Sequence, residues 1–174
     1  MIYYAQDGLV IRDMEKRDIA HFVAWEREQG WNSSPAKFED ELKDHADGRA
    51  IPLTAEYAGE PAGYVSVYPN SLLGSMGGRG YTEIVDFAVL EKYRRHGIGS
   101  CLMDVAERIA AGYSRVVYLG VGLHNGYGSA QRMYAKRGYI PDGTGVWYKD
   151  QVCTPYTTYY PNDDDLVLYL SKEL

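Results

Sequence analysis

The chain has 174 residues, of which 45% are hydrophobic and 24% are charged, and its formal net charge is −6 at pH 7. This length and composition are typical of one globular domain, here residues 1–174, and exclude a mainly disordered protein. The acidic balance argues against nucleic-acid binding, which needs a large basic face. Two cysteines are too few for a disulfide framework and have no metal-binding spacing, so we expect no metal site and a reducing, cytoplasmic location.

Targeting and membrane signals are not evident in the sequence. The first residues contain no basic segment followed by an apolar one, so we expect no secretory signal. No run of about 18 apolar residues occurs, and we therefore expect no membrane-spanning helix and no membrane partner. No internal repeat or low-complexity tract suggests a second domain.

The first half of the chain predicts strands and helices in alternation. Residues 9–12 alternate as in a strand, and Ile19, Phe22, Val23 and Glu26 then recur at helical spacing. Ser34 and Pro35 are typical of an N-cap and a first helical residue, so a second helix is expected up to Gly48. Residues 51–58 and 62–68 are strand-like and joined by Gly59-Glu60-Pro61, which predicts a hairpin, and residues 73–80 predict a glycine-rich loop.

The second half predicts a strand, a glycine turn and a helix, followed by further elements. The strand is residues 81–89, and the helix runs from Gly97 to Gly112. Residues 116–121 predict another strand, residues 129–137 a helix ended by Gly138, and residues 166–170 a final strand. The order of elements indicates a mixed α/β fold.

The segment Arg94-Arg95-His96-Gly97-Ile98-Gly99 lies between the best predicted strand and its helix. The first turn of a helix exposes unpaired N–H groups, and glycines let a ligand approach the backbone, so this segment favours a diphosphate. Two arginines add charge-assisted donors. The alternative is a basic turn with two glycines. The segment lacks the third glycine of a dinucleotide motif and the Lys-Ser/Thr ending of a P-loop.

The pattern RxxGxG after a strand, with Glu83 upstream and Tyr134-Ala135-Lys136-Arg137-Gly138-Tyr139 downstream, resembles the GNAT superfamily of acetyl-CoA-dependent N-acetyltransferases. The similarity is good over residues 81–139 and extends elsewhere only to the order of elements. It implies a mixed, mostly antiparallel sheet of six or seven strands with about four helices. It also implies a gap between the splayed strands 81–89 and 116–121, where the pantetheine arm pairs with the backbone.

The resemblance also implies which residues bind the acetyl-CoA co-substrate. Main-chain N–H groups of the turn hold the pyrophosphate, and main-chain groups of the preceding strand contact the pantetheine arm and the thioester carbonyl. The residues are Arg94, Arg95, Gly97, Ile98, Gly99 and Ser100 for the turn and Phe87, Ala88 and Val89 for the strand. The family usually has an asparagine seven residues before the tyrosine, where this chain has Tyr127, so Asn125 or Ser129 are the expected donors instead.

Two catalytic residues follow from the same resemblance. Tyr134 stands where a hydroxyl often protonates the departing CoA thiolate, although it could also be a packed helix aromatic. Glu83 stands where a carboxylate takes the proton of the incoming amine, or it could form a salt bridge or hydrogen bond to Tyr81 or Arg79 at the strand end. Asp86 is the next candidate base, but strand alternation places it on the other face from Glu83 unless a bulge intervenes.

The acceptor is expected to be a primary amine of a small molecule, such as an amino acid, a polyamine-like metabolite or an amine-bearing drug. The acidic balance favours a cationic amine, and Trp31 and Glu26 are candidate substrate-binding residues, although each could equally be structural. A protein N-terminus or lysine is the alternative acceptor. A non-catalytic acyl-CoA-binding sensor is a rival from another class, and edge strands leave room for a homodimer.

Overall fold

The computed structural model describes residues 1–156 and 158–174. Within these residues the chain forms nine β-strands, four α-helices and two short 3-10 helices in a mixed α/β fold. They make up two compact units, of which unit 1 is residues 1–68 and 84–112, and unit 2 is residues 69–83 and 113–174. Among the described helices, none combines the length and the apolar character needed to cross a bilayer.

Unit 1 contains four whole strands, part of a fifth, and three helices. The strands are β1 (Ile2–Gln6), β2 (Leu9–Asp13), β3 (Ile51–Tyr57), β4 (Glu60–Tyr68) and the part of β5 (Thr82–Val89) that starts at Ile84. The helices are α1 (Lys16–Glu28), α2 (Pro35–Ala46) and α3 (Ile98–Ala111). Neighbouring strands follow the order β1-β2-β3-β4-β5, and the first three pairs are antiparallel.

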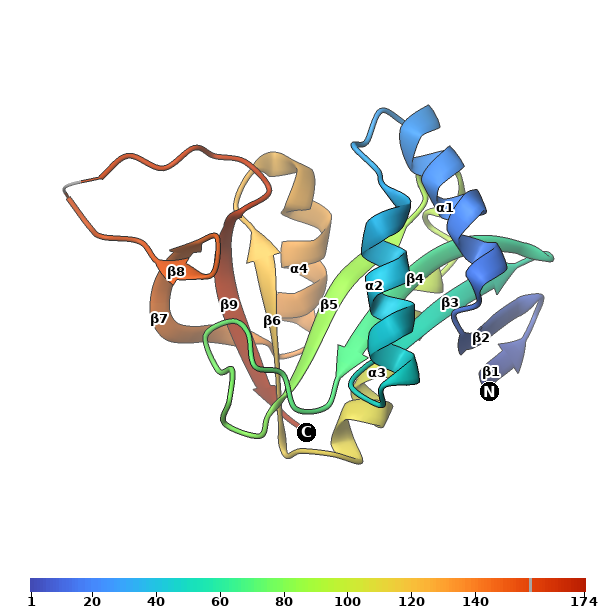
Figure 1. Ribbon diagram of the computed structural model, residues 1–174, viewed down its shortest axis with the longest axis horizontal. Helices are drawn as coiled ribbons and strands as arrows, with labels where there is room; N and C mark the ends of the chain where they lie inside the picture. The colour runs from blue at the N-terminus through green and yellow to red at the C-terminus, as the bar shows by residue number, and fades with distance from the viewer. Residues whose placement is uncertain (157) are drawn as a thin grey trace. The chain divides into compact units, whose positions relative to one another are not determined.

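The helices of unit 1 cover opposite faces of its strands, as Figure 1 shows. Tyr64 of β4 contacts Phe22 of α1 and Phe38 of α2, with ring centroids 4.9 and 5.1 Å apart. A Cβ on the neighbouring Gly63 would lie 3.3 Å from the Leu102 side chain of α3. Because adjacent residues of a strand point to opposite faces, α1 and α2 pack on one face and α3 on the other. The same Cβ would lie 2.7 Å from the carbonyl oxygen of Ala88, so Gly63 lets β4 and β5 approach closely.

A buried ion pair fixes the start of α1 against the strands. Arg12 of β2 donates to both carboxylate oxygens of Asp18 at 2.7 and 2.8 Å, and Thr54 of β3 donates to the same carboxylate at 2.9 Å. Asp18 also accepts the amide of Glu15, which makes a capping box at the N-terminus of the helix. Burial raises the pKa of Asp18, but these hydrogen bonds outweigh it and hold that pKa below its usual value.

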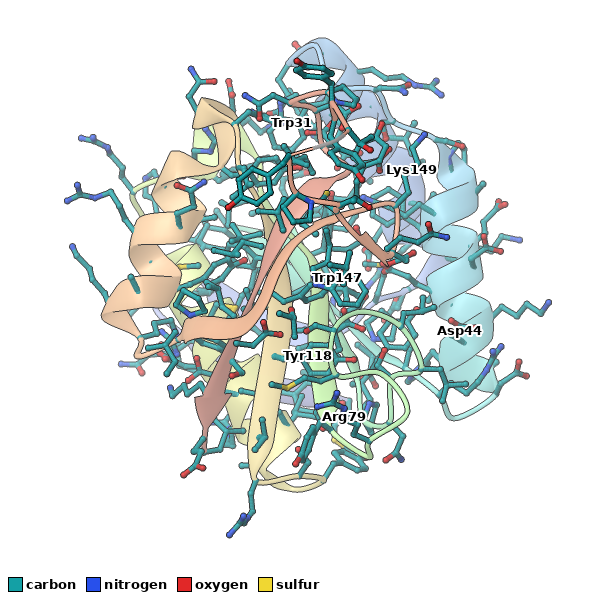
Figure 2. The ribbon with its side chains drawn as sticks, turned by 90° about the vertical axis from the view of Figure 1, so that its left-hand side faces the viewer. Trp31, Asp44, Arg79, Tyr118, Trp147 and Lys149 are labelled. Atoms are coloured by element: carbon teal, nitrogen blue, oxygen red, sulfur yellow. The ribbon has the colours of Figure 1, made fainter. Side chains whose placement is uncertain are left out.

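Unit 2 contains the remaining strands and α4 (Gly128–Lys136). Its strands are Thr82 and Glu83 of β5, β6 (Val116–Gly122), β7 (Ile140–Tyr148), β8 (Gln151–Val152) and β9 (Leu166–Glu173), in the order β5-β6-β9-β7-β8. β5 pairs in parallel with β6, whereas the other pairs are antiparallel. Tyr118 and Trp147, both labelled in Figure 2, each contact Tyr169 of β9, with ring centroids 6.2 and 5.3 Å away.

The structure confirms the mixed α/β fold and the helices expected from the sequence. The predicted second helix does start at Pro35, where the Ser34 side chain accepts the Ala36 amide. The described residues form nine strands, more than the six or seven expected. The strands absent from the prediction are β1, β7 and β8. The hairpin turn is also tighter than expected. Ala58 and Gly59, both at positive φ, form the turn, and Glu60 already belongs to β4.

We expect the Asp18→Ala substitution to lower the free energy of unfolding by about 3 kcal/mol, the lower end of the range for a broken buried ion pair, because the Arg12 guanidinium loses its buried partner and keeps only the partly exposed Glu56. Denaturant unfolding followed by circular dichroism measures this change. The control is Arg17→Ala, which removes an exposed ion pair with Glu15 on the same helix and should cost less than about 1 kcal/mol. Equal losses in the two variants would contradict the importance of the buried pair.

Candidate functional site

The first turn of α3 in unit 1 is open to an anionic ligand. Gly97 is the N-cap in the left-handed conformation, φ +78°, and no side chain caps the helix there. Ile98 is buried and anchors the turn, whereas Arg94 and Arg95 beside it are exposed. The positive end of the helix dipole, free amides and two guanidinium groups therefore occur together.

The strand that precedes this turn packs directly on it. A Cβ on Gly99 would lie 3.1 Å from the Phe87 ring of β5, so the glycine allows that ring to cover the helix start. Phe87, Ala88 and Val89 are half-buried. Arg94 returns to this strand and donates from Nε to the Val89 carbonyl at 3.3 Å. The strand and the turn of unit 1 are thus in direct contact.

A second polar group of unit 1 surrounds Glu26 of α1, which is 3% exposed. Glu26 accepts hydrogen bonds from Ser33 and from the Tyr64 hydroxyl. Lys37 of α2 donates to the Tyr64 hydroxyl at 3.0 Å, and its Nζ lies 4.0 Å from Glu26. Burial, followed by the charge of Glu26, raises the pKa of Tyr64, so this hydroxyl stays protonated.

Glu41 of α2 and Asp86 of β5 form a carboxyl pair beside that group. Glu41 is 3% exposed and accepts a hydrogen bond from Ser66 of β4 at 2.6 Å. Burial, and then the neighbouring Asp86, raises the pKa of Glu41 to about 9. Asp86 has a left-handed backbone, φ +52°, which interrupts the alternation of β5, and its carboxylate lies 4.0 Å from the Lys37 ammonium.

Glu83 is buried in unit 2, at 5% exposure. Ser71 donates to its Oε2 at 2.5 Å, and the Tyr118 hydroxyl, which donates to the Leu73 carbonyl at 2.7 Å, lies 3.4 Å from the same oxygen. Burial and the charge of Glu83 raise the pKa of Tyr118. The sequence suggests Tyr81 or Arg79 as partners of this carboxylate, and the structure adds the loop residue Ser71 and the β6 residue Tyr118.

Tyr134 lies in α4 of unit 2 and is 5% exposed. Its ring centroid is 5.8 Å from that of Tyr139. Burial, followed by the neighbouring Tyr127, raises the pKa of Tyr134, so its hydroxyl carries its proton at neutral pH. A buried and protonated phenol is suited to proton donation.

The segment before α4 has an arrangement that the sequence did not suggest. The ring of Tyr127 covers Gly122, where a Cβ would lie 2.3 Å from the ring. The Tyr127 hydroxyl donates to Asp164 at 3.0 Å, and His124 Nε2 lies 2.9 Å from the same carboxylate oxygen. Asn125 and Ser129, the expected pantetheine donors, are both exposed in this segment.

The residues expected from the sequence thus fall in both units. Unit 1 brings the turn Arg94 to Ser100 together with Phe87 and Val89, and it holds Glu26 and the half-exposed Trp31, whose ring lies 5.9 Å from the Arg94 guanidinium. Unit 2 holds Glu83, Tyr134, Asn125 and Ser129. The roles given to these residues stay predictions. Glu26 is enclosed by hydrogen-bond partners, which is also what a structural carboxylate requires.

Sequence reasoning missed Lys37, Glu41, Tyr64 and Ser66. One signal was present, because Glu41 stands three residues after Phe38 and so shares the buried face of its helix. A carboxylate on an apolar helix face is unusual and points to a partner or a ligand. The identity of the neighbours could not be read from α2, because they come from β4 and β5.

Comparison with known proteins agrees with this architecture. The sequence profile of the Acetyltransferase (GNAT) family matches residues 13–139. No curated protein sequence matches the chain significantly.

Solved structures of similar fold include Ard1 from Thermoplasma volcanium, with 21% identity, a TM-score of 0.70, and coverage of 96% of this chain and 98% of that one. A ribosomal-protein-alanine N-acetyltransferase from Brucella melitensis has 20% identity and a TM-score of 0.67, with 94% and 99% covered. The ribosomal L7/L12 N-acetyltransferase RimL, solved in complex with coenzyme A, has 13% identity and a TM-score of 0.73, with 100% and 98% covered.

The family profile covers most of the chain, and the fold agrees with it over nearly the whole length. The start of α3 has no side-chain cap, so its first amides are open to an anion. The chain therefore belongs to the GNAT family and is an acetyl-CoA-dependent N-acetyltransferase.

Proposed function

We propose that this enzyme transfers the acetyl group of acetyl-CoA to a primary amine of a small cationic molecule. The observation that carries the proposal is the excess of carboxylates in unit 1, where Glu26, Glu41 and Asp86 share one ammonium group, Lys37. A site of this charge favours a cationic acceptor and disfavours an acidic one. The amine attacks the thioester directly, without an acyl-enzyme.

The coenzyme would be held by unit 1. The amides of the α3 first turn and the arginines Arg94 and Arg95 bind the pyrophosphate, and main-chain groups of residues 87–89 contact the pantetheine arm and the thioester. The support for this assignment is the uncapped helix start with a left-handed glycine at the N-cap. Acetyl-CoA supplies the activated acetyl group, and the chain supplies orientation and proton transfer.

Glu83 and Tyr134 of unit 2 would move the protons. An amine with a pKa near that of lysine, about 10.4, is almost wholly protonated at neutral pH, so attack requires a base. Glu83, a buried carboxylate beside hydroxyl groups, takes that proton directly or through water. Tyr134, which stays protonated, donates its proton to the sulfur as the thiolate leaves.

A protein N-terminus is the second candidate acceptor. The observation in its favour is that several solved structures of this fold carry names that describe acetylation of ribosomal proteins. Release of the CoA thiol, measured with a panel of small amines and a panel of short peptides with free N-termini, separates the two. Turnover of peptides alone would replace the small-molecule proposal with the second one.

Replacing Gly97 by Glu should weaken coenzyme A binding, because a carboxylate at the helix start repels the diphosphate. The matched control is Gly97→Gln, which has the same size and the same strain at φ +78° but no charge. Neither side chain clashes at its Cβ, since no atom lies within 4 Å of that position. Calorimetry should show a dissociation constant at least about tenfold higher for Glu than for Gln, with the difference shrinking in high salt. Equal constants would place the diphosphate elsewhere.

Tyr134→Phe should lower kcat by about 10²- to 10⁴-fold while the KM for acetyl-CoA changes by less than about threefold, because only proton donation is lost. Steady-state thiol release measures both constants. Tyr139→Phe is the control. Tyr139 follows α4 and its ring neighbours that of Tyr134, so this variant removes the same kind of hydroxyl group and should leave kcat nearly unchanged. Unaltered kcat in Tyr134→Phe would remove this residue from the acid role.

Glu83→Gln should displace the rise of kcat/KM to higher pH, because the amine must then lose its proton to the solvent. The measurement is the pH profile of kcat/KM between pH 6 and about 10. Ser71→Ala is the control, because it removes one hydrogen bond to Glu83 and keeps the carboxylate. A profile that coincides with that of the unaltered enzyme would show that another group is the base.

A further inference from the structure

Two buried carboxylates of unit 1 differ in how completely they are paired. Asp18 accepts two hydrogen bonds from Arg12, one from Thr54 and one from the Glu15 amide, so both its oxygens and its charge are satisfied. This is the arrangement expected of a structural acid. Glu41, buried to the same extent, is paired quite differently.

One oxygen of Glu41 lacks a donor. Oε2 accepts the Ser66 hydroxyl at 2.6 Å, whereas Oε1 has no hydrogen-bond donor among the described residues. The carboxyl group that faces Glu41 is Asp86, and two carboxylates can hydrogen-bond to each other only when one of them carries a proton. Apart from that proton, no donor of the described residues reaches this buried oxygen, so a donor from outside the chain could take the proton's place.

The groups around the pair leave its charge only partly compensated. Lys37 approaches Asp86 and Glu26 equally, at 4.0 Å each, so its single charge is shared. On the other side, the Tyr68 hydroxyl donates to Asp44 at 3.0 Å, and Asp44 is labelled on α2 in Figure 2. Burial, followed by Asp44, raises the pKa of Tyr68, so the flanking tyrosine is neutral, while the charge of Asp44 is balanced by Arg49, which lies 2.6 Å from it.

Asp86 is the solvent-exposed member of the pair. The Asp86 side chain is 40% exposed, whereas Glu41 behind it is buried. The left-handed backbone at Asp86 turns this residue out of the regular alternation of β5 just before Phe87. A ligand that carries a positive charge can therefore contact Asp86 first and Oε1 of Glu41 beyond it. The raised pKa of Glu41 fits this order, since the proton on Glu41 stands where a cation would otherwise lie.

We propose that the Glu41–Asp86 pair binds a second cationic group of the acceptor, an ammonium or guanidinium group distinct from the amine that is acetylated. The inference rests on the proposed function and narrows its substrate class to amines with two positive charges. The reacting nitrogen is unsuited to this position, because two carboxylates stabilise an ammonium in its protonated, unreactive form. A group that stays charged throughout the reaction has no such conflict. On binding, it displaces the proton that Glu41 carries, and that proton passes to the solvent.

The test compares acceptors that differ only in the second charge. The pairs are 1,5-diaminopentane with 5-amino-1-pentanol, and lysine amide with norleucine amide. We expect thiol-release kinetics to give a kcat/KM about 10- to 100-fold higher for the dication of a pair, the range expected for a charge-assisted contact. Equal values within each pair, with acetylation of both members, would overturn the inference and leave the proposed function intact.

Glu41→Gln should abolish this preference and preserve the fold, because a glutamine amide has the shape of a protonated carboxyl group and can still accept from Ser66. Asp86→Asn should also abolish the preference for dications, because Asp86 is the exposed member of the pair. The control is Glu39→Gln, the same change at an exposed position of α2 two residues away, which should retain the full preference. Retention of the preference in Glu41→Gln would contradict the proposal.

Calorimetry of 1,5-diaminopentane binding supplies a readout that does not depend on turnover. Titrations at pH 7 in buffers of different ionisation enthalpy should show release of a proton in the unaltered protein and none in Glu41→Gln. Binding with proton release but without thiol release would overturn the proposed function and retain the cation site. Absence of both binding and preference would overturn the site itself.

Discussion

The left-handed backbone at Asp86 determines the directions in which the side chains of β5 point. A regular strand would place Asp86 opposite in direction to Phe87 and in line with Ile84, which is buried. With φ at +52°, the alternation is broken and the Asp86 carboxylate lies near Lys37 and Glu41 of α2. Aspartate is one of the few residues besides glycine that tolerate this conformation at modest cost. An aspartate at this position therefore both tolerates the left-handed backbone and supplies the negative charge.

Much of the fold could be predicted because its helices and central strands follow simple periodicities. The Ser34-Pro35 start of α2 and the long apolar stripe of α3 are examples. β1 was missed because it is an edge strand that is largely exposed, and β7 because Gly143 and Gly145 interrupt its pattern. Such strands are held by their neighbours, here β2 and β9, and not by their own composition.

The candidate site could be predicted where it is local in sequence and not elsewhere. The turn from Arg94 to Gly99 carries its own signal, because a helix start, two glycines and two arginines are contiguous. The group around Glu41 assembles α2, β4 and β5, whose residues are separated by 20 or more positions along the chain. Only the apolar face on which Glu41 lies gave a hint. The hydrogen bond from Ser71 to Glu83 could not be foreseen for the same reason, since Ser71 lies in a loop without periodicity.

The packing of Tyr127 on Gly122 has a consequence for the evolution of this chain. A side chain at position 122 would place its first carbon 2.3 Å from the ring, far inside any tolerated separation, so Gly122 cannot be exchanged while the ring of Tyr127 stays where it is. The same ring is tied through its hydroxyl to Asp164. Homologues that depart from glycine at 122 must therefore replace the tyrosine too, and the two positions should co-vary as a linked pair.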